Sequence, residues 1–185
     1  MLLYNKDRGD KMKKSLWKDI RESLIIILAF LFIHTQLFAQ SKVPSSSMVP
    51  TINTNDRLII NKVAAKYKEP DRGNIVVFLK EKKVLLDEYW IKRVIALPNE
   101  VIDIKEGRVY IDGEPLEENY TIGTTLAFAG GISFPYTVPE GHYFVMGDNR
   151  ENSYDSRGLG AIDEDDITAI GALKIYPFND IGILE

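Results

Sequence analysis

Cysteine is absent from this chain of 185 residues, and histidine occurs only at His34 and His142. Without a thiol, no disulfide can cross-link the fold, and neither a cysteine nucleophile nor a cysteine-based metal site is possible. Two histidines are too few for the usual His-rich zinc clusters, so we expect no metal and no cofactor. Hydroxyl, amine and carboxylate groups remain as candidates for chemistry.

Positive charge is scarce outside one end of the chain. Residues 1–22 carry seven Lys or Arg against four Asp or Glu, a net +3, and since the whole chain carries −4 the remainder carries −7. An acidic body lacks the basic patches that bind phosphate backbones, so we expect no nucleic-acid partner. The length suits one compact domain with an appendage.

One long apolar run, SLIIILAFLFIHTQLFAQ, follows the basic end and covers Ser23 to Gln40. As a helix, residues 23–39 would span about 25 Å, slightly less than a bilayer core of about 30 Å. The positive flank predicts an N-terminus in the cytoplasm and a body outside. A basic start, a short apolar core and a final alanine at Ala39 also describe a cleavable secretory signal, so the residues alone leave both interpretations open.

From Ser41 onward, short β-rich runs alternate with turn residues, and no long helical period appears. Residues 101–112 predict a hairpin that turns at Glu106-Gly107, and Asp112-Gly113 predicts a second turn. The pattern favours a mostly-β fold, with coiled antiparallel sheets or a partly closed barrel.

Three consecutive serines stand between two prolines in KVPSSSMVPT, which begins at Lys42. Each proline fixes φ near −65° and stiffens its neighbour, which is unlike a flexible linker. A serine hydroxyl becomes a good nucleophile only when a nearby base takes its proton. His34 lies in the apolar run and His142 follows a turn, so neither is a strong candidate for that base.

A lysine can act as the base if burial lowers its pKa from about 10.4 towards 8, which costs roughly 3 kcal/mol. In EYWIKRVIALP, a strand would place Trp90, Lys92 and Val94 on one face. Lys92 therefore has apolar neighbours on its own face. An exposed strand lysine whose stem covers apolar groups fits the same pattern, so both interpretations stay open here.

A third stretch, GDNRENSYDSRGLG at residues 147–160, is dense in small polar and charged groups. These side chains can hydrogen-bond to one another and orient a base. A solvated surface loop has the same composition.

Together the three stretches resemble the type I signal peptidase family. PSSSMVPT is similar to its nucleophile box, YWIKRVIALPNE to its lysine box and GDNRENSYDSR to its C-terminal box, while DRGNIVVF is similar to a further structural box. The four motifs follow the family's order from Pro44 to Arg157, and four ordered motifs are far more specific than one.

The resemblance implies a serine endopeptidase that removes signal peptides from exported preproteins through an acyl-enzyme, cutting after small residues at −1 and −3. It implies that Ser47 is the nucleophile, that Lys92 is the general base, and that Ser45 and the Ser47 backbone N–H form the oxyanion hole. Ser46 would be dispensable. Ser153 would hydrogen-bond to the lysine amine.

The resemblance also implies supporting and substrate-binding residues. The supporting groups would be Asp148, Asp155 and Arg157. Shallow apolar pockets for the substrate would be lined by Val43, Met48, Ile52 and Ile91.

In this family the apolar segment stays as a single membrane anchor, which makes the phospholipid membrane a partner. The implied divisions are a basic cytoplasmic N-terminus (1–22), a transmembrane anchor (23–40) and an extracytoplasmic serine protease domain (41–185). Self-cleavage near Ala39 stays open.

The chain departs from the family's pattern at Asn74, Asn99 and Glu151, none of which is an implied catalytic group. Two alternatives remain. Self-cleaving repressors share a Ser-Lys dyad on a similar β core, but the N-terminus has no room for a helix-turn-helix. An inactive secreted binding domain could keep the same fold.

Overall fold

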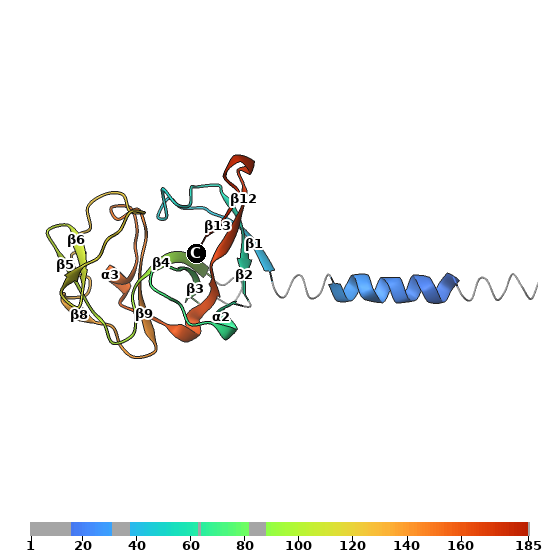
Figure 1. The fold of residues 1–185 in the computed structure, drawn as a ribbon, viewed down its shortest axis with the longest axis horizontal. Coiled ribbons are helices and arrows are strands. Elements are labelled where there is room, and N and C mark those ends of the chain that lie inside the picture. The colour runs from blue at the N-terminus through green and yellow to red at the C-terminus, as the bar shows by residue number, and fades with distance from the viewer. Residues whose placement is uncertain (1–15, 31–37, 63, 82–87, 185) are drawn as a thin grey trace, which may run out of the picture. The chain divides into compact units, whose positions relative to one another are not determined.

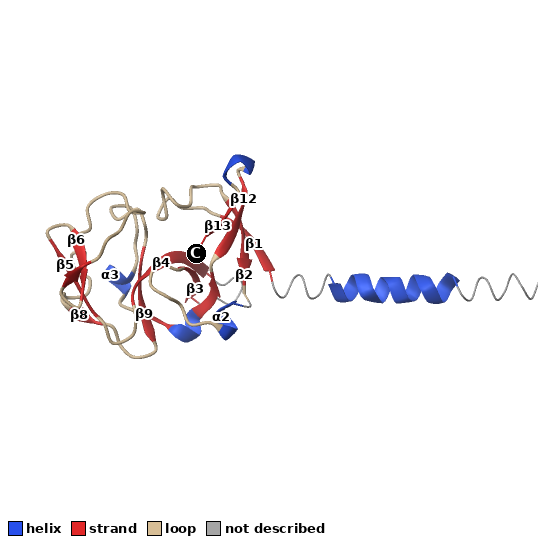
Figure 2. Cartoon of the chain, in the orientation of Figure 1, coloured by secondary structure: helices blue, strands red, loops and turns tan. Residues whose placement is uncertain are grey.

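The computed structural model of the chain describes residues 16–30, 38–62, 64–81 and 88–184. The chain divides into two units, residues 1–38 and residues 39–185. The described residues of the second unit form strands and loops with only short helical turns (Figure 2). The predicted mostly-β fold is therefore confirmed for the body of the chain.

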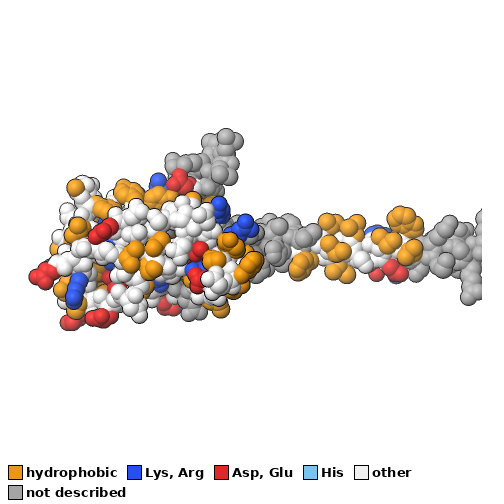
Figure 3. All heavy atoms as spheres, turned by 90° about the horizontal axis from the view of Figure 1, so that it is seen from above, with side chains coloured by type: hydrophobic (Ala, Val, Ile, Leu, Met, Phe, Trp, Pro, Cys, Tyr) orange, Lys and Arg blue, Asp and Glu red, His pale blue; other side chains and the backbone are white. Residues whose placement is uncertain are grey.

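The first unit contains a helix over residues 16–30, whose side chains are all exposed. Figure 3 shows hydrophobic groups along it. Among the described residues, no helix is both long and apolar enough to cross a membrane.

The anchor predicted over residues 23–40 is only partly described. It is helical up to residue 30, and residues 31–37 lie outside the described residues. Its last residues, 38–40, are strand rather than helix, because β1 (Phe38–Lys42) joins a sheet beside β2 (Arg57–Asn61).

A five-stranded antiparallel sheet, in the order β10-β9-β4-β3-β11, forms the centre of the body. Strand β4 (Glu88–Ala96) pairs with β3 (Ile75–Glu81) on one side and with β9 (His142–Met146) on the other. The sheet is completed by β10 (Ile162–Asp163) and β11 (Ile167–Ile170). Figure 1 shows it curling at β3 and β4.

A second sheet has the order β1-β2-β12-β13, in which β12 (Ala172–Tyr176) lies between β2 and β13 (Gly182–Leu184). Both pairings of β12 are antiparallel. The short helical segments of the body are α2 (Ala64–Tyr67), α3 (Ser156–Leu159) and the 3-10 turns η1 (Glu164–Asp166) and η2 (Phe178–Asp180).

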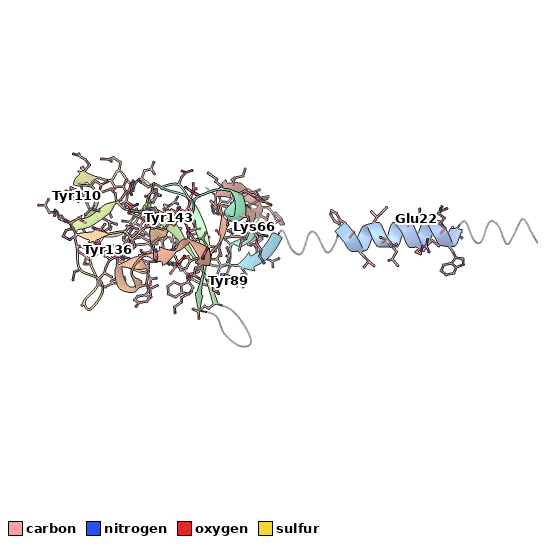
Figure 4. All side chains as sticks on the ribbon, turned by 90° about the horizontal axis from the view of Figure 1, so that it is seen from below. Glu22, Lys66, Tyr89, Tyr110, Tyr136 and Tyr143 are labelled. Carbon is pink, nitrogen blue, oxygen red and sulfur yellow. The ribbon has the colours of Figure 1, made fainter. Side chains whose placement is uncertain are left out.

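A third sheet has the order β7-β6-β5-β8. Its strands are β5 (Val101–Lys105), β6 (Arg108–Ile111), β7 (Glu114–Pro115) and β8 (Tyr136–Thr137). Figure 4 shows Tyr110 and Tyr136 of this sheet at the end of the body opposite Lys66.

The two turns predicted in this third sheet are both present. Glu106 and Gly107 have φ of 51° and 77°, and Asp112 and Gly113 have φ of 51° and 88°. Two successive positive φ values are the geometry of a tight hairpin turn that matches the twist of its strands.

One apolar cluster of the core fixes the segment that carries the three serines. Val43, Met48 and Ile52 of that segment are buried together with residues of β2, β3 and β12, namely Leu58, Ile75 and Ala172. Burying a side chain of this size stabilises the fold by about 1.5–3 kcal/mol. The serine segment is therefore held in place by its own apolar side chains.

Candidate active site

The serine loop, residues 43–56, connects β1 to β2 and is closed at its base by backbone hydrogen bonds. Val43 N–H donates to Asp56 O over 3.0 Å, and Asn55 N–H donates to Val43 O over 2.9 Å. Within the loop, Ile52 N–H donates to a carbonyl four residues earlier over 2.8 Å. The loop is thus a compact structure, as the flanking prolines led us to expect.

Ser47 and Lys92 are in direct contact across the fold. Lys92 Nζ lies 2.9 Å from Ser47 Oγ and 3.2 Å from Ile91 O. Lys92 is 4% exposed and Ser47 is 8% exposed. A buried amine placed against a hydroxyl can accept its proton when the amine is neutral, and that makes the hydroxyl nucleophilic.

The charge state of Lys92 is set mainly by its burial. Desolvation lowers the pKa of this amine from 10.5 to about 8, although Asp155 and Asp148 raise it and Arg157 lowers it slightly. Among the described residues, no carboxylate lies within ion-pair distance of Lys92. At pH 7, therefore, Lys92 is a neutral amine in about one molecule in ten.

Ser45 lies beside the hydroxyl of Ser47. The two Oγ atoms are 3.3 Å apart, and the Ser45 side chain is exposed on the serine loop. Its hydroxyl is therefore within reach of negative charge that develops on a carbonyl oxygen bound next to Ser47.

Asp148 and Arg93 form a buried, two-pronged ion pair next to the base strand. Arg93 Nε and NH2 donate to the two carboxylate oxygens over 2.9 Å and 2.8 Å. Thr51 Oγ1 donates to the same carboxylate over 2.5 Å. Because Arg93 follows Lys92 on β4 and Thr51 belongs to the serine loop, this pair holds the two parts of the site against each other.

Asp155 and Arg157 form a second buried ion pair. Arg157 Nε and NH2 donate to the carboxylate of Asp155, each over 2.9 Å. The carboxylate also accepts the Gly147 N–H over 3.1 Å, and Arg157 NH2 donates to Ser153 O over 3.2 Å. This pair therefore fixes the ends of the polar stretch that follows β9.

Ser153 differs from the implied arrangement. Its Oγ is buried and has no hydrogen-bond partner among the described residues, so it does not form the implied bond to the amine of Lys92. The amine instead donates to Ser47 and to the carbonyl of Ile91. Ser153 nevertheless lies close to the site, because a Cβ added at Gly147 would be 2.3 Å from Ser153 Oγ and 2.4 Å from Ser47 O.

A groove of about 370 Å³ lies beside Ser47 and Lys92. All four side chains expected in the substrate pockets line it, namely Val43, Met48, Ile52 and Ile91. Three aromatic side chains, Tyr89, Trp90 and Tyr154, line it as well, and the last two meet edge to face with ring centres 6.1 Å apart. The groove can therefore hold an extended apolar segment next to the serine.

The sequence did not reveal how the polar stretch holds the serine loop. Asn149 N–H donates to Ser47 O over 3.0 Å, and its side-chain amide donates to Ser46 O over 3.2 Å. Asn152 Nδ2 donates to Ser46 Oγ over 2.8 Å. Ser46, for which no role was expected, thus takes part in these contacts. The density of asparagines was visible in the sequence, but their partners, about 100 residues away, were not.

The three departures from the family's pattern have local explanations. Asn99 has φ of 70°, a conformation that asparagine tolerates better than most residues. Asn74 Oδ1 accepts the N–H of Asp71 over 3.0 Å. Glu151 Oε1 accepts the N–H of Thr124 over 3.0 Å.

His142 Nδ1 lies 2.9 Å from Glu140 O, at the start of β9, and His34 lies outside the described residues. No group of three or more His, Asp or Glu side chains in the described part of the chain could hold a metal ion.

A serine hydroxyl, a buried lysine amine and a second hydroxyl beside them form a site suited to acyl transfer, the chemistry of serine peptidases. Comparisons with known proteins identify the kind of peptidase. The family model described as "Signal peptidase, peptidase S26" matches residues 16–176. The chain belongs to this family.

Relatives with the same name span most of the chain. A Signal peptidase I from Leptolyngbya laminosa is 41% identical over 166 residues, covering 87% of this chain and 79% of the relative. A Signal peptidase I from Bacillus licheniformis is 34% identical over 182 residues, covering 95% of this chain and 96% of the relative. A crystal structure of a signal peptidase I from Enterococcus faecalis V583 matches with a TM-score of 0.45 at 30% identity, over 56% of this chain and 97% of that one. The chain is thus an enzyme of the signal peptidase I class, and the family supports removal of signal peptides as its activity.

We expect Gly147→Ala to damage the site, because the added Cβ would overlap both Ser153 Oγ and Ser47 O. Such overpacking costs about 1–3 kcal/mol of stability, and the displaced serine should lower preprotein cleavage by at least about tenfold. The matched control is Gly182→Ala, where an added Cβ meets nothing within 4 Å. Wild-type turnover in Gly147→Ala would contradict this account.

We expect Lys92→Met to stabilise the fold at pH 7. A folded-state pKa of about 8 against 10.5 means that burial of the ammonium costs about 3 kcal/mol at pH 7. The unfolded chain holds this proton more tightly, so the stability of the wild type rises between pH 8 and pH 10.5. Urea unfolding should therefore show an advantage of about 1–3 kcal/mol for Lys92→Met at pH 7 that shrinks by pH 10.5. An equal difference at both pH values would show that Lys92 is not desolvated.

Proposed function

We propose that this chain is a membrane-anchored serine endopeptidase that removes signal peptides from exported preproteins, with Ser47 as nucleophile and Lys92 as general base. The contact of 2.9 Å between Lys92 Nζ and Ser47 Oγ is the observation that carries the proposal. It is supported by the pKa of about 8 at Lys92, which allows a neutral amine near physiological pH.

The proposed reaction has two stages. Neutral Lys92 takes the proton of Ser47, and Ser47 Oγ attacks the carbonyl carbon of the scissile bond. The Ser45 hydroxyl and the Ser47 N–H donate to the oxyanion, where one donor contributes about 3 kcal/mol. Lys92 then gives its proton to the leaving amine, which breaks the peptide bond and leaves an ester on Ser47. Neutral Lys92 next takes a proton from water, and the hydroxide formed attacks the ester carbonyl. Lys92 returns that proton to Ser47 Oγ as the ester bond breaks, which releases the signal peptide.

The proposed specificity is for small residues at positions −1 and −3 of the substrate. Met48 and Ile52 are 2% and 0% exposed, so the groove beside Ser47 has a closed apolar floor. A small side chain fits such a floor, whereas a large one would have to displace packed core residues. An extended substrate places alternate side chains on the same face, which accounts for two such positions.

Cleavage of a preprotein with alanine at −1 and −3 tests the proposal. With purified protein in detergent, Ser47→Ala should lower the rate by at least about 1000-fold. The wild-type rate should rise with pH and level off above about 8, because only neutral Lys92 accepts the proton.

Two controls accompany this experiment. Ser46→Ala should retain activity within a few-fold, since Ser46 Oγ only accepts a bond from Asn152. A preprotein with tryptophan at −1 should resist cleavage. Cleavage that survives Ser47→Ala would refute the mechanism, and inactivity of a folded wild type would favour a binding domain.

We further propose that the apolar run that begins at Ser23 and ends before β1 anchors the enzyme, with residues 1–22 in the cytoplasm and the β-rich body outside. The apolar run and its basic flank support this orientation. In bacteria that express the chain, the protein should stay with the membrane in alkaline carbonate and keep its full mass of 21.0 kDa. A protein that begins after Ala39 would instead show that the segment is a cleaved signal. Ile27→Arg with Leu28→Arg should weaken membrane retention.

A further inference from the structure

Lys174 is a second buried lysine that contacts the serine loop, and the proposed reaction does not use it. Its side chain is 4% exposed and projects from β12 of the second sheet. Its amine donates to Thr51 O over 2.9 Å and to Asp180 Oδ2 over 2.7 Å, and it lies 3.3 Å from Asp56 Oδ2. All three N–H donors of the ammonium thus have acceptors.

The two buried lysines have opposite charge preferences. At Lys174 burial acts to lower the pKa, but the hydrogen bonds that its amine donates to Asp180 and Asp56 outweigh this effect, so that the pKa is raised. At Lys92 desolvation prevails and the pKa falls to about 8. Lys174 therefore stays a fixed ammonium where Lys92 can become a neutral base, and Lys174 does not serve as a proton acceptor.

Two of the three partners of Lys174 belong to the serine loop. Asp56 closes the base of the loop, where its backbone carbonyl accepts the Val43 N–H and its side chain accepts the Asn53 N–H over 2.8 Å. Thr51 lies four residues after Ser47, and its hydroxyl is bonded to Asp148 on the other side. Thr51 is thus held from two directions, through its carbonyl by Lys174 and through its hydroxyl by Asp148.

We propose, on the basis of the function proposed above, that Lys174 is a positioning residue that holds the serine loop so that Ser47 Oγ stays within reach of Lys92 Nζ. Lys92 is held in place by β4, the central strand of its sheet. The position of Ser47 relative to Lys92 therefore depends on how the serine loop is held. A catalytic group displaced by about 1 Å can lose up to about a hundredfold in rate. Met48 and Ile52 are held by their own burial, so the groove should keep its affinity for substrate when Lys174 is lost.

Lys174→Met in the full chain in detergent should lower kcat for preprotein cleavage by about tenfold, while KM changes by less than about twofold. Rates are compared at least 20 °C below each variant's unfolding midpoint, so that loss of folded protein does not contribute. The matched control is Val109→Ala, a fully buried position in β6 of the third sheet. It should lower the unfolding temperature and leave kcat unchanged.

Asp180→Asn tests whether catalysis depends on the contacts of Lys174 with the serine loop rather than on its bond to Asp180. Asp180 is 57% exposed and bonds to Lys174 without belonging to the serine loop. This variant should keep kcat within about twofold, because the bonds to Thr51 and Asp56 remain. Equal losses in Asp180→Asn and Lys174→Met would refute the proposal, as would wild-type kcat in Lys174→Met or a parallel loss in Val109→Ala.

If Lys174→Met fails to fold, the double variant Lys174→Met with Asp56→Asn removes the unpaired buried carboxylate, and the same loss of kcat is expected. The kcat of the Lys174 variants is compared with that of the wild type and of Ser47→Ala. A wild type whose cleavage does not depend on Ser47 would refute the proposed function itself. Ser47-dependent cleavage with an unimpaired Lys174→Met enzyme would refute only the role of Lys174.

Discussion

The burial of the Lys92 amine against Ser47 is the constraint on which the rest of the structure depends. A lysine that is 4% exposed, and that no carboxylate of the described residues contacts, is unfavourable as an ammonium, and that is why its pKa falls to about 8. The fold tolerates this because β4 is central in its sheet and paired on both sides. The same burial that destabilises the charged form makes the amine available as a base.

Negative charge near this amine is present but neutralised. Asp148 and Asp155 both act to raise the pKa of Lys92, yet Arg93 and Arg157 pair with them through buried two-pronged contacts. Each pair also bonds to a second part of the site, the first to Thr51 and the second to the backbone of Gly147. The ion pairs therefore organise the site without converting Lys92 into an ordinary ammonium.

The serine loop is fixed by contacts from several elements distant in the chain. Asn149 holds its backbone at Ser47, Asp148 holds Thr51 by its hydroxyl, and Lys174 holds Thr51 by its carbonyl. Family membership decides against the self-cleaving repressors as an alternative, since the signal peptidase S26 model extends from residue 16 to residue 176.

The sequence by itself determined the mostly-β body and the two hairpin turns, because each rests on local patterns of apolar residues and glycines. The order of its motifs also predicted Ser47 and Lys92 as the reacting groups. Only the tertiary structure decided which side chains meet. Ser153 is close to the site but unbonded, Ser46 has partners, and Lys174 reaches Thr51 across 123 residues of chain. A lysine's pKa depends on which carboxylates the fold brings to it, and local sequence carries no record of those distances. That is why the pKa of Lys92 is lowered, whereas the pKa of Lys174, which bonds to Asp180, is raised.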